Sequence, residues 1–218
     1  MVTLGFALVG CRFGDAVPVG ATLQDGQVLV GEISTATLQL DGALGEIEIP
    51  LDDVGLLVPV EGATVGDSHG NVDVWLRNGS ELRGRWADPE LDMAITVGGG
   101  AVAVGVPTDD LQALQLRGAE DWSSGPVYRV RTTHGDDFLV DPESTQVHLE
   151  NPLGSFAPFL SECASIGPVG SPDGDWRVVL NTGTVLVGQV GEDALTFALP
   201  LGPEEVVVPL RSLVSLSS

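Results

Sequence analysis

The sequence of 218 residues contains no lysine, and its nine cationic side chains are all arginine. It also contains 31 aspartate and glutamate residues, so the formal net charge at pH 7 is −22. A chain with so few scattered cations repels a phosphate backbone and gains no electrostatic attraction to an anionic membrane surface. The composition therefore argues against a nucleic-acid partner, and against a membrane surface except through an attached lipid.

Cysteine, aromatic residues and long apolar runs are also scarce. The two cysteines, Cys11 and Cys163, lie far apart and match no zinc-binding spacing. No apolar run reaches the roughly 20 residues that span a bilayer. The chain is nevertheless 43% hydrophobic and contains 29 glycines, so its composition is that of a folding chain and not of a disordered acidic tail.

Four short turn signals divide the chain into similar segments. Each is a dipeptide that ends in glycine between apolar strands: Asp25-Gly26, Asn78-Gly79, His134-Gly135 and Thr182-Gly183. The glycines are separated by 53, 56 and 48 residues. Asp-Gly and Asn-Gly are typical of type I′ hairpin turns, in which both residues have positive φ. We therefore predict four hairpins, the first two from these dipeptides and the last two by alignment.

The strand after each turn has a large–small–large order on one face. Side chains three, five and seven residues after the turn glycine share that face, because the side-chain period of a strand is two. In three segments the middle residue is glycine, namely Gly31, Gly84 and Gly188. A glycine there permits a sharp bend or a close backbone approach. The third segment diverges, with Val140 and Pro142 at the middle and last positions.

Two further strands are predicted in each segment, and a proline closes the second of them. These prolines are Pro50, Pro107, Pro158 and Pro209. An apolar pair three residues apart follows each one, which fits one helical turn or a short closing strand. The pairs are Val54 with Leu57, Leu111 with Leu114, Cys163 with Ile166, and Leu213 with Leu216. Only residues 109–116 show weak helical periodicity, so we predict an all-β fold.

We predict four tandem antiparallel β repeats joined by linkers rich in glycine, proline and acidic residues. Residues 1–20 precede them, and the repeats cover residues 21–60, 72–116, 127–166 and 176–216. The order strand, tight turn, strand with a central glycine, two more strands, proline and closing segment resembles the small β-barrels of Sm-like and SH3-like proteins. A four-bladed propeller and two β-sandwiches are the alternative architectures.

The resemblance to Sm-like proteins implies RNA binding, which we keep as an alternative function. In that family a loop near the end of the barrel approaches the RNA. Here the matching positions include Asp52-Asp53 and Asp109-Asp110, whose carboxylates would face the phosphates. Like charge at this position disfavours RNA, and a fold alone does not imply a function.

Leu8-Val9-Gly10-Cys11 resembles the lipobox of bacterial lipoproteins. The resemblance implies a lipid on the thiol of Cys11 and an exported protein of the cell envelope. The sequence departs from that pattern because no Arg or Lys precedes the short apolar run. The alternative is a first strand over residues 2–9 with a buried cysteine, in a cytoplasmic protein.

Catalytic patterns are not evident in the sequence. His69, His134 and His148 have no metal-binding spacing, and Cys163 aligns with core positions, which predicts a buried inert thiol. Trp75, Trp86 and Trp176 lie in or beside predicted strands, which predicts core packing. Gly98-Gly99-Gly100 has no following helix and is predicted to be a hairpin loop.

The paired acids Asp52, Asp53, Asp109 and Asp110 are weak candidates for calcium ligands, because none fits the spacing of an EF-hand loop. We therefore predict no metal and no cofactor. The expected function is a non-enzymatic binding or assembly module that has a protein partner or self-associates. The alternative enzyme is a hydrolase with two catalytic acids.

Overall fold

The structure is a computed structural model that describes residues 16–60, 72–86, 88–117, 126–171 and 174–218. These residues contain β-strands and short 3₁₀ turns and no α-helix, so the all-β prediction is confirmed. Eighteen strands belong to one antiparallel sheet, and β18 and β19 form a separate ladder. The strands are β1 Val17–Leu23, β2 Val28–Ile33, β3 Thr37–Gly42, β4 Gly45–Pro50, β5 Val54–Pro59, β6 Val72–Leu76, β7 Glu81–Trp86, β8 Glu90–Val97, β9 Gly100–Pro107, β10 Leu111–Leu116, β11 Tyr128–Thr132, β12 Asp137–Val140, β13 Leu149–Asn151, β14 Gly154–Phe156, β15 Cys163–Pro168, β16 Trp176–Leu180, β17 Val185–Val190, β18 Ala194–Ala198, β19 Glu205–Pro209 and β20 Leu213–Ser217.

The four predicted turns are present, but the type I′ geometry predicted for the first two is wrong. Gly26 has a φ of 87°, whereas no described residue other than glycine has positive φ. The Gly26 N–H donates to the Leu23 carbonyl at 3.0 Å, and the Leu23 N–H donates to the Gln27 carbonyl at 2.9 Å. The same pair of hydrogen bonds recurs in the other three turns. This is a type I turn followed by a glycine bulge, which requires positive φ at the glycine alone. By contrast, Gly98 and Gly99 both have positive φ, and they form the predicted hairpin loop between β8 and β9.

Each closing strand follows a three-residue 3₁₀ turn, and the weak helical periodicity of residues 109–116 corresponds to such a turn and a strand. Thr108–Asp110 is such a turn, and Leu111–Leu116 is strand β10. The other turns are Leu51–Asp53, Leu160–Glu162 and Leu210–Ser212. The register of all four closing strands shifts by one residue after their first position. A bulge inserts one residue, so apolar residues three apart reach the same face of the strand.

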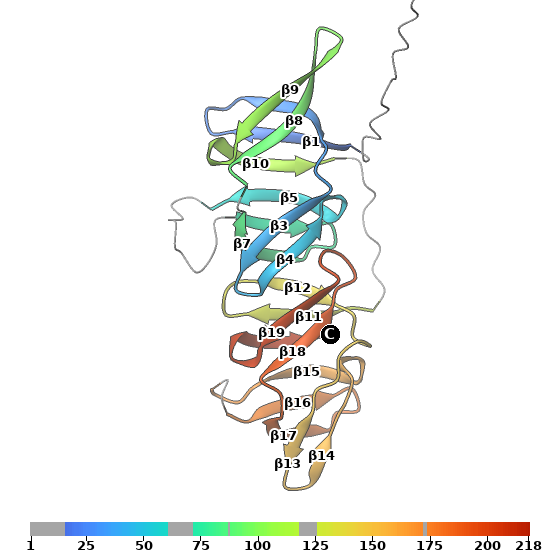
Figure 1. The fold of residues 1–218 in the computed structure, drawn as a ribbon. Helices are drawn as coiled ribbons and strands as arrows, with labels where there is room; N and C mark the ends of the chain where they lie inside the picture. The colour runs from blue at the N-terminus through green and yellow to red at the C-terminus, as the bar shows by residue number, and fades with distance from the viewer. Residues whose placement is uncertain (1–15, 61–71, 87, 118–125, 172–173) are drawn as a thin grey trace, which may run out of the picture.

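The strand pairings cross between consecutive segments of the chain. We call β1–β5 the first segment, β6–β10 the second, β11–β15 the third and β16–β20 the fourth. β2 pairs with β8 of the second segment, and β7 pairs with β3 of the first. The second strand of each of these two segments therefore pairs with the third strand of the other segment. Figure 1 shows this exchange as green β8, β9 and β10 beside blue β1, and blue β3 and β4 beside β7.

Glycine makes the crossed pairings close enough to form. A Cβ added at Gly31 would lie 2.3 Å from the Ala94 carbonyl oxygen, and one at Gly188 would lie 2.2 Å from that of Glu150. A Cβ at Gly84 would lie 2.4 Å from Cγ of Leu40. Each glycine sits on a strand that pairs across segments, so its missing side chain lets the neighbouring strand approach.

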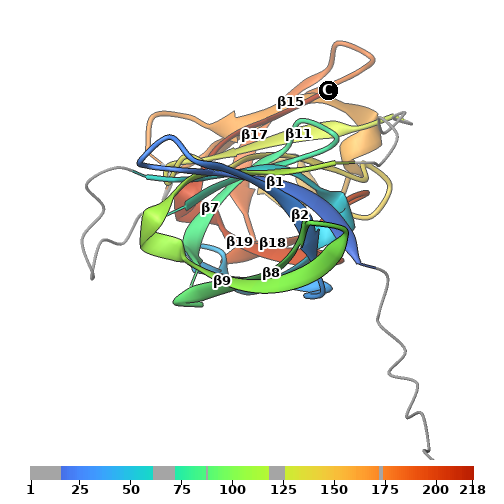
Figure 2. The same cartoon turned by 90° about the horizontal axis from the view of Figure 1, so that it is seen from above.

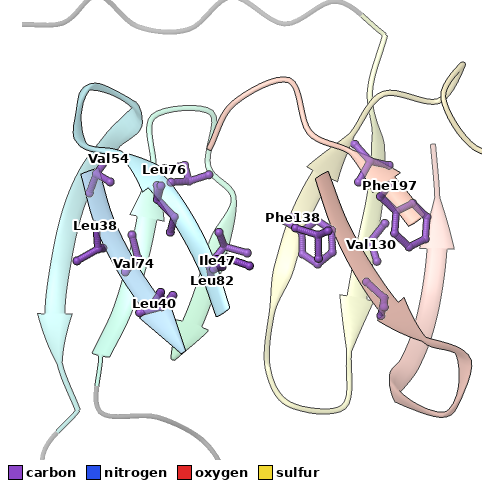
Figure 3. Packing of buried hydrophobic residues seen from close by; sticks show 14 of the residues in the cluster. Leu38, Leu40, Ile47, Val54, Val74, Leu76, Leu82, Val130, Phe138 and Phe197 are labelled. Carbon is purple, nitrogen blue, oxygen red and sulfur yellow. The ribbon is translucent and has the colours of Figure 1, made fainter. Parts of the chain in front are cut away.

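The third segment has Val140 at this position, and the matching ladder is absent among the described residues. One backbone hydrogen bond remains, from the Asp141 N–H to the Ala198 carbonyl at 2.9 Å. Side chains make the contact instead, since Phe138 of β12 meets Phe197 of β18 with ring centroids 6.4 Å apart (Figure 3). Val140 carries the side chain that the three glycines lack, and β18 pairs only with β19 in the described part of the chain.

The segments stack along a column. The β5–β10 ladder joins the first two segments, and the β15–β20 ladder joins the last two. The two halves meet where Asp137 of β12 pairs with Glu81 of β7. Figure 2 looks along the column and shows β8, β9, β18 and β19 on one side, with β1, β11 and β15 on the other. Within the described residues the sheet stays open, because no group of strands closes on itself by hydrogen bonding.

Buried polar groups hold the junction between the two halves. Asp136, 1% exposed, accepts hydrogen bonds from the Arg83 N–H at 2.9 Å and from the Thr132 hydroxyl at 2.8 Å. The hydroxyl of Ser80, which is fully buried, accepts from the Leu139 N–H at 3.0 Å. These bonds satisfy groups that cannot reach water, so the junction has a defined geometry.

Candidate functional site

A cavity of about 270 Å³ lies between the first two segments. Its lining includes Leu57 of β5 and Leu114 of β10, which face each other in the ladder that joins the segments. Other buried side chains continue the lining: Ile33, Leu38, Leu51 and Leu91. The inner part of the cavity is therefore apolar.

The exposed part of the lining is aromatic and acidic. It comes from the end of β7, the connection that follows it and the start of β8, which supply Trp86, Asp88, Glu90 and Asp92. Nε1 of Trp86 donates a hydrogen bond to Oδ2 of Asp88 at 3.0 Å, which fixes the indole relative to that carboxylate. The described lining residues include no arginine and no histidine. The mouth of the cavity therefore carries negative charge beside an aromatic ring.

The two sides of the cavity occupy matching positions in the sequence. Some residues on the second side follow residues on the first by 53 positions, which is also the separation of Gly26 and Gly79. The matching residues are Ile33 and Trp86, Thr35 and Asp88, and Thr37 and Glu90. The pairing of β2 with β8 and of β7 with β3 brings both sets to one place, although only one set is aromatic and acidic.

A second candidate site is the edge of the β8–β9 hairpin. β9 has β8 as its one strand partner in the described part of the chain. Its residues Ala101, Val102 and Ala103 are exposed, and the facing strand ends at Val97, which is 59% exposed. No charged residue occurs from Met93 to Thr108. An exposed, uncharged edge strand has free backbone donors and acceptors that another strand can pair with.

Three other sheet edges are protected from such pairing. β4 carries the exposed charges of Glu46 and Glu48 along its length. The edge of β18 is covered by the side chains that follow β12, since the Thr145 hydroxyl donates to the Thr196 carbonyl at 2.7 Å. β14 is only three residues long. Charge, side-chain capping and shortness are the devices that prevent edge pairing, and β9 has none of them.

The four weak candidates for calcium ligands do not form a metal cluster. Asp52 and Asp53 lie in the first 3₁₀ turn, and Asp109 and Asp110 lie in the second. Oδ2 of Asp53 accepts a hydrogen bond from the Gly202 N–H at 2.9 Å, so this carboxylate contributes to the junction of the two halves. Among the described residues, no three His, Cys, Asp or Glu side chains could hold a metal ion.

Cys163 is buried, as predicted. Its side chain is 1% exposed, and its Sγ donates to the Phe159 carbonyl at 3.3 Å. Burial, with a smaller contribution from Glu162, raises the pKa of this thiol to about 11. Burial also raises the pKa of the neighbouring Tyr128 hydroxyl. A thiol that stays protonated at neutral pH is a poor nucleophile.

The remaining predicted residues are dispersed. His134 lies in the third turn, and Nδ1 of exposed His148 is hydrogen-bonded to Oε1 of Glu192. Trp176 is buried in the core, whereas Trp75 and Trp86 are half-buried. Cys11, His69, Trp122 and the strand predicted over residues 2–9 lie outside the described residues. Within the described residues, no helix is long and apolar enough to cross a membrane.

The predicted turn glycines and most of the closing prolines lie at element boundaries. Gly26, Gly79 and Gly183 occupy the bulge position of their turns with positive φ. Pro50, Pro107 and Pro209 are the last residues of β4, β9 and β19, whereas Pro158 follows β14 by two residues.

No model of a known protein family, no curated protein and no solved structure matches this chain.

Proposed function

We propose that this chain is a non-enzymatic assembly module built from four β repeats of the Sm-like or SH3-like kind. The recurring element order supports this proposal. In each segment a glycine-bulge turn joins two strands, two more strands follow, and a 3₁₀ turn leads into a closing strand. The common bulge in the closing strands supports a common origin for the four segments.

The free edge of β9 is the surface through which we propose that the protein self-associates. This strand and its hairpin are uncharged in a chain of net charge −22. Two copies of the protein repel each other wherever their acidic surfaces meet. Contact through the Gly100–Val104 part of β9 keeps the nearest side chains neutral and small, with Ala101 and Ala103 exposed on the free edge strand. We therefore propose that β9 pairs antiparallel with β9 of a second copy about a two-fold axis.

Sedimentation measurements test this self-association. The native protein is expected to form a dimer at about 100 μM, and the dimer is expected to strengthen as salt screens the repulsion between copies. The variant Ala101→Glu/Ala103→Glu places on β9 the charges that Glu46 and Glu48 place on β4, and it should be monomeric. A matched control, Ala36→Glu/Ala157→Glu, adds the same charge at exposed positions outside the strands and should still dimerise. A native protein that stays monomeric at high salt would show that β9 does not pair with itself.

We further propose that the protein is exported and attached to the cell envelope through a lipid on Cys11. The support is the resemblance of Leu8-Val9-Gly10-Cys11 to a lipobox. The intact mass of the protein from the membrane fraction tests it. A soluble, unmodified chain that begins at Met1 would contradict the proposal.

A further inference from the structure

We propose that the cavity between the first two segments binds an organic cation, namely a guanidinium or alkylammonium group on a short apolar stem. The apolar stem would contact the buried lining around Leu57 and Leu114. The cationic head would lie at the mouth, near the carboxylates of Asp88, Glu90 and Asp92. This inference does not depend on the proposed pairing of β9.

The volume sets the size of the ligand. Drug-sized molecules occupy pockets of about 300–1,000 Å³, and this cavity of about 270 Å³ lies just below that range. It therefore suits a ligand about as large as one long amino-acid side chain. Six buried apolar side chains line its inner part, and Trp86, two threonines and three acidic residues line the rest. Ligand sites combine apolar and polar side chains in this way.

Charge and aromaticity set the chemical class. Three carboxylates line the cavity, and no arginine or histidine is among its described lining residues. An anion there would be repelled, and a neutral ligand would gain no Coulomb attraction from the carboxylates. Trp86 adds an aromatic surface, and indole is the side chain that attracts organic cations most strongly. The overall charge of −22 raises the local concentration of cations and favours their association.

A guanidinium or alkylammonium group can belong to a free small molecule or to an arginine or lysine side chain on a partner protein. Two probes separate them. The first is n-butylguanidinium, which has the head and stem of an arginine side chain and no backbone. The second is a blocked pentapeptide with one central arginine between glycines. Tighter binding of the pentapeptide indicates a protein partner, and tighter binding of butylguanidinium indicates a free small molecule.

Titration calorimetry and ligand-observed NMR on the full chain test the proposal. Native protein is expected to bind butylguanidinium at concentrations up to about 10 mM, with an affinity that falls as salt rises. n-Butylurea has nearly the same shape without the charge and should bind about tenfold more weakly. The variant Asp88→Asn/Glu90→Gln/Asp92→Asn should lose about tenfold in affinity for the cation. These three side chains are exposed, so the variant is expected to keep the native circular dichroism spectrum.

A matched variant separates the local site from the total charge. Glu143→Gln/Glu150→Gln/Glu204→Gln removes three exposed charges from the other half of the molecule and should bind the cation within about twofold of the native protein. Equal losses in both variants would overturn the proposal, because the cation would then respond to net charge alone. Equal binding of butylurea and butylguanidinium would also overturn it, as would the absence of binding by the native protein.

Discussion

The contact between Gly84 and Leu40 tests the exchange of strands between the first two segments. Gly84 belongs to β7 and Leu40 to β3, and Leu40 is 1% exposed. A Cβ added at Gly84 would lie 2.4 Å from Cγ of Leu40, although ordinary contacts begin near 3.4 Å. Gly84→Ala therefore forces the two strands apart or moves Leu40, and we expect it to destabilise the protein by about 1–3 kcal/mol.

A double-mutant cycle turns this contact into a measurement of proximity. Leu40→Ala alone should cost about 2–5 kcal/mol, because it leaves a cavity in the core. In the double variant the methyl group that Gly84→Ala introduces occupies part of that cavity. The double variant should therefore lose about 1–2 kcal/mol less than the sum of the single losses. The measurement is urea unfolding, with the midpoint and the slope fitted separately for each variant.

Gly191→Ala provides the control for the same cycle. A Cβ added at Gly191 has no heavy atom within 4 Å, and the φ of this residue is not positive. Its combination with Leu40→Ala should be additive within about 0.5 kcal/mol. Additive losses for Gly84→Ala and Leu40→Ala would show that β7 does not lie against β3, and the crossed arrangement would then be wrong.

The other predictions concern one buried thiol and one buried carboxylate. The pKa of Cys163 rises from an ordinary value of 9.0 to about 11, so its stabilising effect is complete below pH 9.0 and is lost as pH rises toward about 11. We expect the native thiol to react with a disulfide reagent at about pH 8 only as fast as the protein unfolds. Asp136→Asn should cost about 2 kcal/mol in urea unfolding, because Asp136 accepts two hydrogen bonds while buried. Asp41→Asn, which weakens an exposed ion pair with Arg85, should cost less than about 0.5 kcal/mol.

Local spacing in the sequence was enough to predict the strands. The turn glycines, the alternating apolar residues and the closing prolines each reflect a rule that acts within a few residues. The turn type was mispredicted because Asp25-Gly26 is compatible with two geometries. In the observed one, Oδ1 of Asp25 accepts a hydrogen bond from the Gln27 N–H, and only the glycine needs positive φ.

The crossed pairing could not be predicted from the same spacing. The connection between β2 and β3 and that between β7 and β8 each contain three residues, 34–36 and 87–89. Such short connections also suit ordinary hairpins within a segment. The large–small–large pattern permits another strand to approach closely at Gly31 and Gly84, but it does not identify that strand. The choice between the two pairings therefore depends on contacts between residues far apart in the chain.

The candidate cavity follows from that exchange. Because β2 pairs with β8 and β7 with β3, the connections of two segments line one space, and matching positions such as Thr35 and Asp88 contribute to it together. A change in one segment can then alter one side of the cavity while the other side keeps its packing. Trp86 illustrates this. From the sequence it is predicted to pack in the core, yet in the structure it is half-buried and lines the cavity beside acidic residues that have neutral counterparts in the first segment.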